Sequence, residues 1–138
     1  MPKCRVFAID HSLKQVVENG LYTKHLNGES ISISVVKFVE AQGAALPAKS
    51  HFHGEEASLQ LFGACSVFEG EGADGDHETR MEAGSAMLIP AEQPHYGSNR
   101  FGAEGLSMRL NVVSPPRKEF GPEDAAPYYP LKDREVQA

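Results

Sequence analysis

Short stretches in which apolar and polar residues alternate dominate the hydrophobic pattern of this chain. The clearest is residues 30–39 (SISISVVKFV), where β-branched side chains recur at every second position, as expected of a strand with two different faces. Similar runs that end at glycine or proline predict strands at 57–62, 65–69, 85–89 and 106–113, with shorter candidates at 5–9, 22–26 and 78–81. Only residues 12–18 (SLKQVVE) suggest a helix, with Ser12 as its N-cap.

Many short strands separated by glycine and proline turns indicate an all-β sandwich or a closed barrel. The length of 138 residues and the 41% hydrophobic content fit one ordinary domain with a packed core. The acidic stretch 69–76 (EGEGADGD) is predicted to be the tip of a hairpin. The proline-rich, charged tail 118–138 is expected to run extended over the surface or to be partly disordered.

Charge and composition exclude several classes of partner. The net charge is −6 and no run of Lys or Arg occurs, which argues against nucleic acid and against an anionic membrane surface. No segment reaches the roughly 18 apolar residues of a membrane span. Residues 1–8 lack the apolar stretch of a signal peptide, and Cys4 and Cys65 are too few for a disulfide scaffold. We therefore expect a cytoplasmic protein with two reduced cysteines.

Two histidines at alternate positions, His51 and His53, are the strongest sign of chemistry in the chain. Side chains at i and i+2 of a strand lie on one face, so two neutral imidazoles can approach the same metal ion. A third histidine, His95, comes from a distant predicted strand and can complete the site. Glu55 and Glu56 offer a carboxylate. We expect about one divalent metal ion per chain.

The order of these residues resembles the two motifs of the cupin family, G-x5-H-x-H-x3,4-E-x6-G followed by G-x5-P-x-G-x2-H-x3-N. The second motif is matched well, since its positions are filled by Gly84, Pro90, His95 and Asn99. Glu92 replaces the glycine of the Pro-x-Gly turn, so this turn lacks the residue that most easily adopts a positive φ.

The first cupin motif is matched with two departures. The His51-x-His53 pair is present, and Glu56 stands seven residues before Gly63, as the motif requires. Only two residues separate His53 from Glu56, one fewer than usual, and Gly43 lies eight residues before His51 rather than six. Together the two motifs make the chain resemble a small single-domain cupin over about residues 30–117.

This resemblance implies an all-β jelly-roll barrel formed by one domain over residues 1–138. It also implies that the metal is bound inside the barrel by His51, His53, Glu56 and His95. One or two metal positions would stay open for water or substrate, which is typical of a catalytic site. The shortened spacing leaves open whether Glu55, Glu56 or neither carboxylate is a ligand. Iron, nickel, manganese and zinc all accept imidazole, so the residues do not select among them.

The last predicted strand offers polar side chains for a pocket. Ser107, Arg109 and Asn111 share one face and apolar residues occupy the other, and either face can be the inner one. If Arg109 points inward, its planar guanidinium suits a substrate carboxylate. Gln60 lies on the same strand face as Glu56 and either lines the pocket or is solvated. The other histidines are interpreted as surface residues, namely His11, His25 and His77.

The segment 111–117 (NVVSPPR) resembles the D-x-F-S-P-P-R ending of small cupins that linearise uronates. In that group the aspartate is thought to assist proton transfer and the arginine to hold the substrate acid. Asn111 stands at the aspartate position and cannot act as a general acid or base, so that activity is not carried over. Val113 replaces the phenylalanine, while Arg117 keeps its place as an anion contact.

Three function classes fit these residues. The favoured class is a metal-dependent lyase or isomerase acting on a small oxygenated acid, sugar acid or carbonyl compound, with Glu55, Glu56 and Arg109 as catalytic candidates. A non-haem Fe(II) dioxygenase and a non-catalytic ligand-binding module are the alternatives. Substrate contacts are expected from Gln60, Arg109, Asn111 and Arg117. We also expect a homodimer in which residues 5–9 add a strand to a sheet edge.

Overall fold

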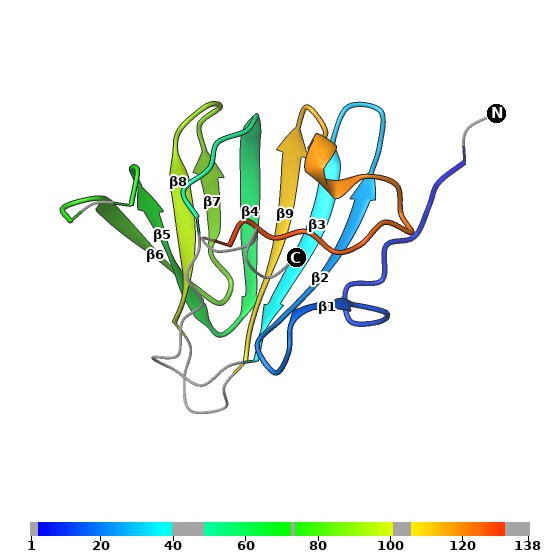
Figure 1. The fold of residues 1–138 in the computed structure, drawn as a ribbon, viewed down its shortest axis with the longest axis horizontal. Helices are drawn as coiled ribbons and strands as arrows, with labels where there is room; N and C mark the ends of the chain where they lie inside the picture. The colour runs from blue at the N-terminus through cyan, green and yellow to red at the C-terminus, as the bar shows by residue number, and fades with distance from the viewer. Residues whose placement is uncertain (1–2, 40–48, 73, 101–105, 132–138) are drawn as a thin grey trace.

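The computed structural model describes residues 3–39, 49–72, 74–100 and 106–131, and these form two antiparallel sheets that face one another (Figure 1). The strands are β1 (Lys14–Val17), β2 (Leu21–Asn27), β3 (Ser32–Phe38), β4 (Glu55–Phe62), β5 (Ala64–Glu69), β6 (His77–Glu82), β7 (Ala86–Ile89), β8 (His95–Arg100) and β9 (Ser107–Ser114). One short 3-10 helix, η1 (Lys118–Phe120), follows them. Among the described residues, no helix is long and apolar enough to cross a membrane.

The strand order shows a jelly roll. The larger sheet has the order β1-β2-β3-β9-β4-β7 and the smaller sheet the order β6-β5-β8. The last strand, β9, lies between β3 and β4, so strands far apart in the sequence pair antiparallel across the middle of the larger sheet. The predicted all-β jelly-roll class is confirmed.

Most predicted strands are present, but two predictions near the N-terminus are wrong. Residues 12–18 are not a helix, because β1 occupies Lys14–Val17 and pairs antiparallel with β2, while Ser12 has a φ of 60°. The β-branched pair at the end of this segment gains more from the sheet edge than from helix propensity. Residues 5–9 form no strand. They run alongside β2, where the Lys24 ammonium donates to the carbonyls of Ala8 (2.9 Å) and His11 (3.1 Å).

The space between the two sheets is divided into a polar end and an apolar end. At the end where β4 begins, most buried inward-facing side chains of the larger sheet are polar, and Val113 and Ile89 are apolar exceptions. The polar ones are Ser32, Ser34, Glu56, Ser58 and Asn111. At the other end, Leu21, Val36 and Phe38 form the apolar core together with Tyr129 and Leu131. Apolar burial therefore stabilises one half of the barrel, and the other half is left for chemistry.

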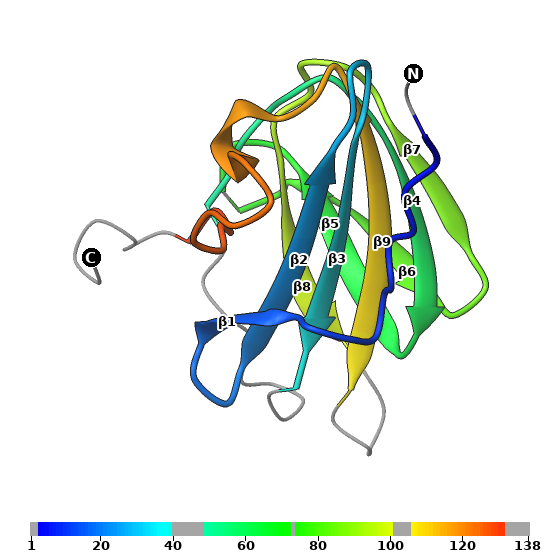
Figure 2. The same ribbon diagram turned by 90° about the vertical axis from the view of Figure 1, so that its right-hand side faces the viewer.

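The segment 117–131 closes the open side between the two sheets (Figures 1 and 2). It was expected to run extended over the surface, but Phe120, Tyr129 and Leu131 are buried. The Lys49 amide donates to the Pro130 carbonyl at 2.7 Å, which ties the segment to the chain just before the histidine pair. Apolar side chains explain this placement, since a tail with two tyrosines and a leucine gains free energy by covering the core. Residues 132–138 lie outside the described part.

Candidate metal centre

Backbone hydrogen bonds bring the three histidines of the two motifs together. The amide of His51 donates to the His95 carbonyl and the amide of His95 donates to the His51 carbonyl, both at 2.9 Å, so the two residues form an antiparallel bridge. The Glu92 amide donates to the His53 carbonyl at 2.8 Å. The turn before β8 therefore holds the segment with the histidine pair in a defined register.

Glu92, which stands at the glycine position of the second motif, has a φ of 64°. A glutamate in this left-handed region is strained, because its Cβ approaches its own backbone. The turn thus keeps the conformation that the motif glycine normally supplies, at a cost in free energy. The hydrogen bond from the Glu92 amide to His53 is part of what holds the turn in place.

Each of the three imidazoles directs Nδ1 at a backbone carbonyl. The Nδ1 atoms of His51, His53 and His95 lie 3.0, 2.8 and 2.8 Å from the carbonyl oxygens of residues 49, 54 and 93. A carbonyl only accepts, so Nδ1 carries the ring proton in each case. The nitrogen with a free lone pair is therefore Nε2 in all three rings, which is how metal-binding histidines are commonly oriented.

The three rings converge. One ligand nitrogen from each of His51, His53 and His95 lies within 4.8 Å of the others, and Nε2 of His53 is buried without a hydrogen-bond partner. Burial lowers the pKa of His51 to about 3, with the neighbouring His95 acting in the same direction, and burial also lowers the pKa of His95. Neutral, converging imidazoles fit a divalent ion with nitrogen ligands.

Glu56 is buried beside the histidines and Glu55 is not. The Oε1 atom of Glu56 lies 3.2 Å from Nε2 of His53, and the Oε2 atom of Glu56 accepts a hydrogen bond from Ser58. Burial alone raises the pKa of Glu56, but the His53 imidazole, the charge of Arg109 and the Ser58 hydroxyl together bring it well below its usual value. Glu55 is exposed, because alternate residues of β4 face outward. Glu56 is thus the carboxylate at the centre, although the mutually close ligand atoms belong to the histidines.

The inner face of β9 carries its polar residues. Arg109 and Asn111 line a cavity next to His51 and His95, and Arg117 lines it from the segment after β9. Nε of Arg109, Nε of Arg117 and Oδ1 of Asn111 are buried there without hydrogen-bond partners. Met108, Leu110 and Val112, which were the other candidates for the inner face, lie on the opposite face of β9. The cavity is only about 30 Å³, enough for one water molecule.

Gln60 faces inward but supports the wall of the barrel rather than the cavity. Its Nε2 atom donates to Ser107 Oγ at 2.9 Å and to the Phe62 carbonyl at 2.8 Å, and Cys65 donates to its Oε1 atom at 3.2 Å. Cys65 in turn accepts a hydrogen bond from Arg109 at 3.4 Å. Gln60 therefore reaches the cavity only through Cys65 and Arg109.

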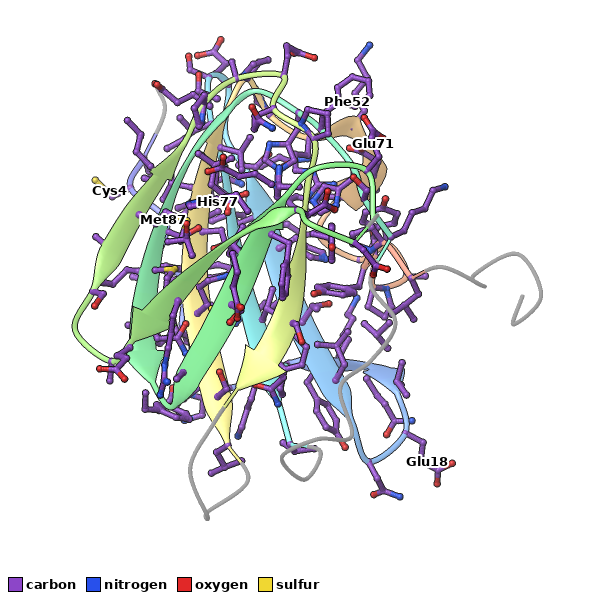
Figure 3. The ribbon with its side chains drawn as sticks, turned by 90° about the vertical axis from the view of Figure 1, so that its left-hand side faces the viewer. Cys4, Glu18, Phe52, Glu71, His77 and Met87 are labelled. Carbon is purple, nitrogen blue, oxygen red and sulfur yellow. The ribbon has the colours of Figure 1, made fainter. Side chains whose placement is uncertain are left out.

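Residues of the C-terminal segment form one wall of the cavity. Arg117, Phe120, Tyr128, Tyr129 and Pro130 line it, and Tyr128 and Pro130 also line an open depression of about 490 Å³ on the outside. Phe52, between the paired histidines, points into this depression and is 60% exposed, on the same rim as Glu71 (Figure 3). His51 lines both the small cavity and this depression, so a small molecule in the depression reaches one of the three histidines directly.

His25 is one of the cavity residues that the sequence did not identify. It was interpreted as a surface histidine, but its ring stacks on Phe120 with centroids 3.9 Å apart and lines the cavity. The other two fit that interpretation, since His11 is exposed and His77 is exposed on β6 (Figure 3). Thr23 and His25 stand at alternate positions of β2 and therefore share one face of the strand, which was the signal available in the sequence. This signal identifies His25 as a cavity residue only when the position of Phe120 against its ring is known.

Comparison with solved structures identifies the fold. KdgF from a Halomonas species has a TM-score of 0.60 and 21% identity, over 80% of this chain and 94% of that chain. An RmlC-like cupin from Shewanella frigidimarina has a TM-score of 0.63 and 17% identity, over 86% of this chain and 96% of that one. A Bacillus subtilis oxalate decarboxylase variant matches 78% of this chain with 28% of its own length, at a TM-score of 0.58 and 16% identity.

Comparison at the level of sequence finds no relative. No family model matches the chain, and a search of curated proteins gives no match. The evidence is therefore the arrangement of the two sheets, which the solved structures share. On these grounds the chain has the cupin jelly-roll fold.

Proposed function

We propose that this protein is a metal-dependent enzyme of the lyase or isomerase type that acts on a small oxygenated acid. One observation carries the proposal: three proton-free imidazole nitrogens converge beside a cavity whose other polar groups include two arginines without full sets of partners. A metal centre next to a buried cationic pocket suits a substrate with an anionic group and a reactive oxygen close together.

In this proposal His51, His53 and His95 hold one divalent ion, with Glu56 as the adjoining carboxylate. A bound ion supplies Lewis acidity to a substrate oxygen. Iron, nickel, manganese and zinc all suit the imidazole ligands, so the choice of metal is a matter for measurement. The Nδ1 contacts with backbone carbonyls orient the three rings before any metal arrives.

Arg109 and Arg117 are proposed to bind the anionic group of the substrate. Arg109 lies on the inner face of β9, and the guanidinium carbon of Arg117 lies 5.0 Å from the ring centre of Phe120 and 5.6 Å from that of Tyr128. These rings orient Arg117 from the C-terminal segment. A carboxylate between the two arginines would satisfy donors that are buried and unpaired. Because the cavity of about 30 Å³ holds only one water molecule, this binding would require the wall formed by the C-terminal segment to move outward. Asn111 adds an amide to the same wall.

Glu56 is proposed to move a proton of the bound substrate. It is the buried carboxylate at the centre, and its lowered pKa keeps it in the base form at neutral pH. Glu55 is set aside for this role, because it is exposed on the outer face of β4. Asn111 occupies the place where uronate-linearising cupins carry an aspartate, so Glu56 is the proposed base here.

The experiment is a metal reconstitution followed by an activity panel. Apo-protein is loaded separately with Fe(II), Ni(II), Mn(II) and Zn(II) and assayed on small hydroxy, keto and unsaturated sugar acids, with oxygen consumption recorded in parallel. Turnover without oxygen uptake, lost in Glu56→Gln and in Arg109→Gln, supports the proposal. Oxygen uptake with Fe(II) on a catechol or diketone would favour the dioxygenase alternative. Binding without turnover across the panel would favour a ligand-binding module.

Two further expectations accompany this proposal. The homodimer predicted from the sequence stays a prediction, although residues 5–9 lie alongside β2 in an irregular conformation and so would not pair as a strand without rearrangement. A mass close to that of the 15.0 kDa chain in light scattering would contradict a dimer. The expected cytoplasmic location likewise stays a prediction.

A further inference from the structure

The open depression outside the metal centre adjoins the small cavity. Its volume is about 490 Å³, and it shares the lining residues His51, Tyr128 and Pro130 with the cavity. The cavity holds about one water molecule, so the larger part of any substrate has to lie elsewhere. The depression has the size that small ligands occupy. It is therefore the space beside the histidines in which the body of a substrate can lie.

Four side chains that contain rings give the depression flat apolar surface. They are Phe52, Pro94, Tyr128 and Pro130, and they come from three separate parts of the chain. Phe52 is 60% exposed and lies on the same rim as Glu71 (Figure 3). A single exposed apolar side chain is ordinary on a protein surface. Several rings gathered in one concave surface, next to converging metal ligands, are typical of a ligand site.

Phe52 is held at a defined place relative to the metal ligands. His51 and His53 direct their rings at a common point, and Phe52 between them lines the depression instead. The backbone is fixed on both sides of Phe52, because His51 and His95 form a bridge and the Glu92 amide donates to the His53 carbonyl. Phe52 can therefore position a ligand against His51 without reorganising the chain.

The charged residues of the depression disfavour a second negative charge. Its described lining includes the carboxylates of Glu71 and Glu92 and the ammonium of Lys49, two anions against one cation, which leaves a net charge of −1. Both glutamates are exposed, and within the part of the chain that the structure describes neither carboxylate has a hydrogen-bond or ion-pair partner. The small cavity has the opposite character, because Arg109 and Arg117 line it. A molecule that spans both spaces is expected to carry negative charge at one end only.

We propose that the depression binds the body of the substrate, and that Phe52 selects an α-hydroxy or α-oxo monocarboxylic acid whose body is a flat, uncharged ring. This inference rests on the proposed function and names its substrate class. The acid group lies toward the arginines, the ring lies against Phe52, and His51 borders both spaces. Glu71 and Glu92 disfavour a dicarboxylic acid by repulsion between like charges. Phe52 determines specificity and takes no part in the chemical step.

The test compares three α-hydroxy acids that share a head and differ in the body. The body of lactate is a methyl group, that of phenyllactate carries a phenyl ring, and that of malate carries a second carboxylate. Binding to the full-length protein loaded with Zn(II) is measured by calorimetry. We expect phenyllactate to bind about tenfold more tightly than lactate, because its ring is partly buried against Phe52. Phe52→Ala should reduce this ratio about fivefold, and Phe52→Tyr, which keeps the ring, should retain it.

Two further variants separate the ring contact from the charge effect. Phe62→Ala removes another exposed phenylalanine, at the end of β4 and outside the lining of the depression, and should bind the three acids as the wild type does. Glu71→Gln/Glu92→Gln should raise the affinity for malate about threefold at low ionic strength. Its affinity for phenyllactate should change much less, because phenyllactate has no charge on its body.

The outcomes distinguish the subsite from the proposed function. Equal affinities for lactate and phenyllactate, or an unchanged ratio in Phe52→Ala, would overturn the subsite and leave the metal centre as proposed. Binding of neither acid would overturn the proposed substrate class together with the subsite. Metal content, measured by elemental analysis, should be the same in all variants. Loss of metal in Phe52→Ala would also contradict the proposal, since Phe52 would then support the histidines rather than select the ligand.

Discussion

The Nε2 atom of His53 lies 3.2 Å from Oε1 of Glu56, and both side chains are buried. Nδ1 of the same ring lies 2.8 Å from the Gly54 carbonyl. An imidazole nitrogen and a carboxylate oxygen at this separation can both ligate one divalent ion. The pair is therefore where we expect Glu56 to join the three histidines at a metal ion.

The metal assignment predicts the behaviour of a double variant. His51→Ala/His53→Ala removes two of the three converging imidazoles, and one imidazole with a carboxylate is a poor site for a divalent ion. We expect metal content to fall from about one ion per chain to near zero, measured by elemental analysis after dialysis. The control is His11→Ala/His77→Ala, which removes two exposed histidines. Full metal retention in the first variant would rule out the assignment.

The two adjacent glutamates are predicted to behave differently. Glu56→Gln removes the charge beside His53 and should weaken metal binding by about 10- to 100-fold, as is typical when a partner of a metal ligand is lost. Glu55→Gln, its exposed neighbour on β4, should bind metal normally. Competition with a chelator of known affinity measures both. Normal affinity combined with lost turnover in Glu56→Gln would show that Glu56 moves protons without contributing to the metal site.

The buried imidazole of His25 predicts a pH dependence of stability. Burial lowers its pKa from 6.5 to about 4, with the charges of Arg117 and Lys14 acting in the same direction and the Tyr128 amide opposing them. Between these values the unfolded chain binds a proton that the folded chain does not, so the free energy of unfolding falls as the pH falls from about 6.5 to about 4. Above about 6.5 the contribution is fully present.

Denaturant titrations at several pH values measure this effect. The loss assigned to His25 should be about 2 kcal/mol, less than the full shift implies because part of the ring meets solvent. His25→Gln should lose stability less steeply than the wild type over this window, whatever its stability at neutral pH. His77→Gln, at an exposed position on β6, is the matched control and should follow the wild-type curve. Parallel curves for His25→Gln and the wild type would contradict the assignment.

The strained turn before β8 predicts a stabilising substitution. Glu92 has a φ of 64°, a conformation that costs a residue with a Cβ roughly 1 kcal/mol and costs glycine little. Glu92→Gly should therefore raise the free energy of unfolding by up to about 1 kcal/mol and keep the metal, since the amide that donates to His53 is retained. Ala91→Gly, at the preceding exposed position, should lower stability instead. A loss of stability in Glu92→Gly would show that its side chain has another role.

Local sequence signals were sufficient for the strands and for the three histidines. Strands recur where β-branched and apolar residues alternate between glycines and prolines, and that pattern depends only on neighbours in the chain. The same local rule failed at residues 12–18, because a short amphipathic run fits a helix or a strand equally well until pairing with β2 decides. The His-x-His spacing was informative because strand geometry places alternate side chains on one face.

Contacts between distant segments decided the rest of the site. Which carboxylate joins the histidines depended on the register of β4, which turns Glu56 inward and Glu55 outward. The direction of Arg109 depended on which face of β9 meets the interior, since both faces were plausible when only the strand was known. The sequence alone cannot say which glutamate or which face of β9 points inward. A shift of one residue in the pairing of a strand moves every side chain of that strand to the opposite face.

The sequence by itself determined an all-β domain with three histidines able to share a metal, because these features follow from short-range periodicity and from the chemistry of the residues. Only the tertiary structure decided that residues 117–131 close the barrel, that His25 stacks on Phe120, and that an open depression lies beside His51. These features arise where segments about a hundred residues apart pack together. Long-range packing of this kind depends on the shape of the whole barrel, which no local pattern encodes.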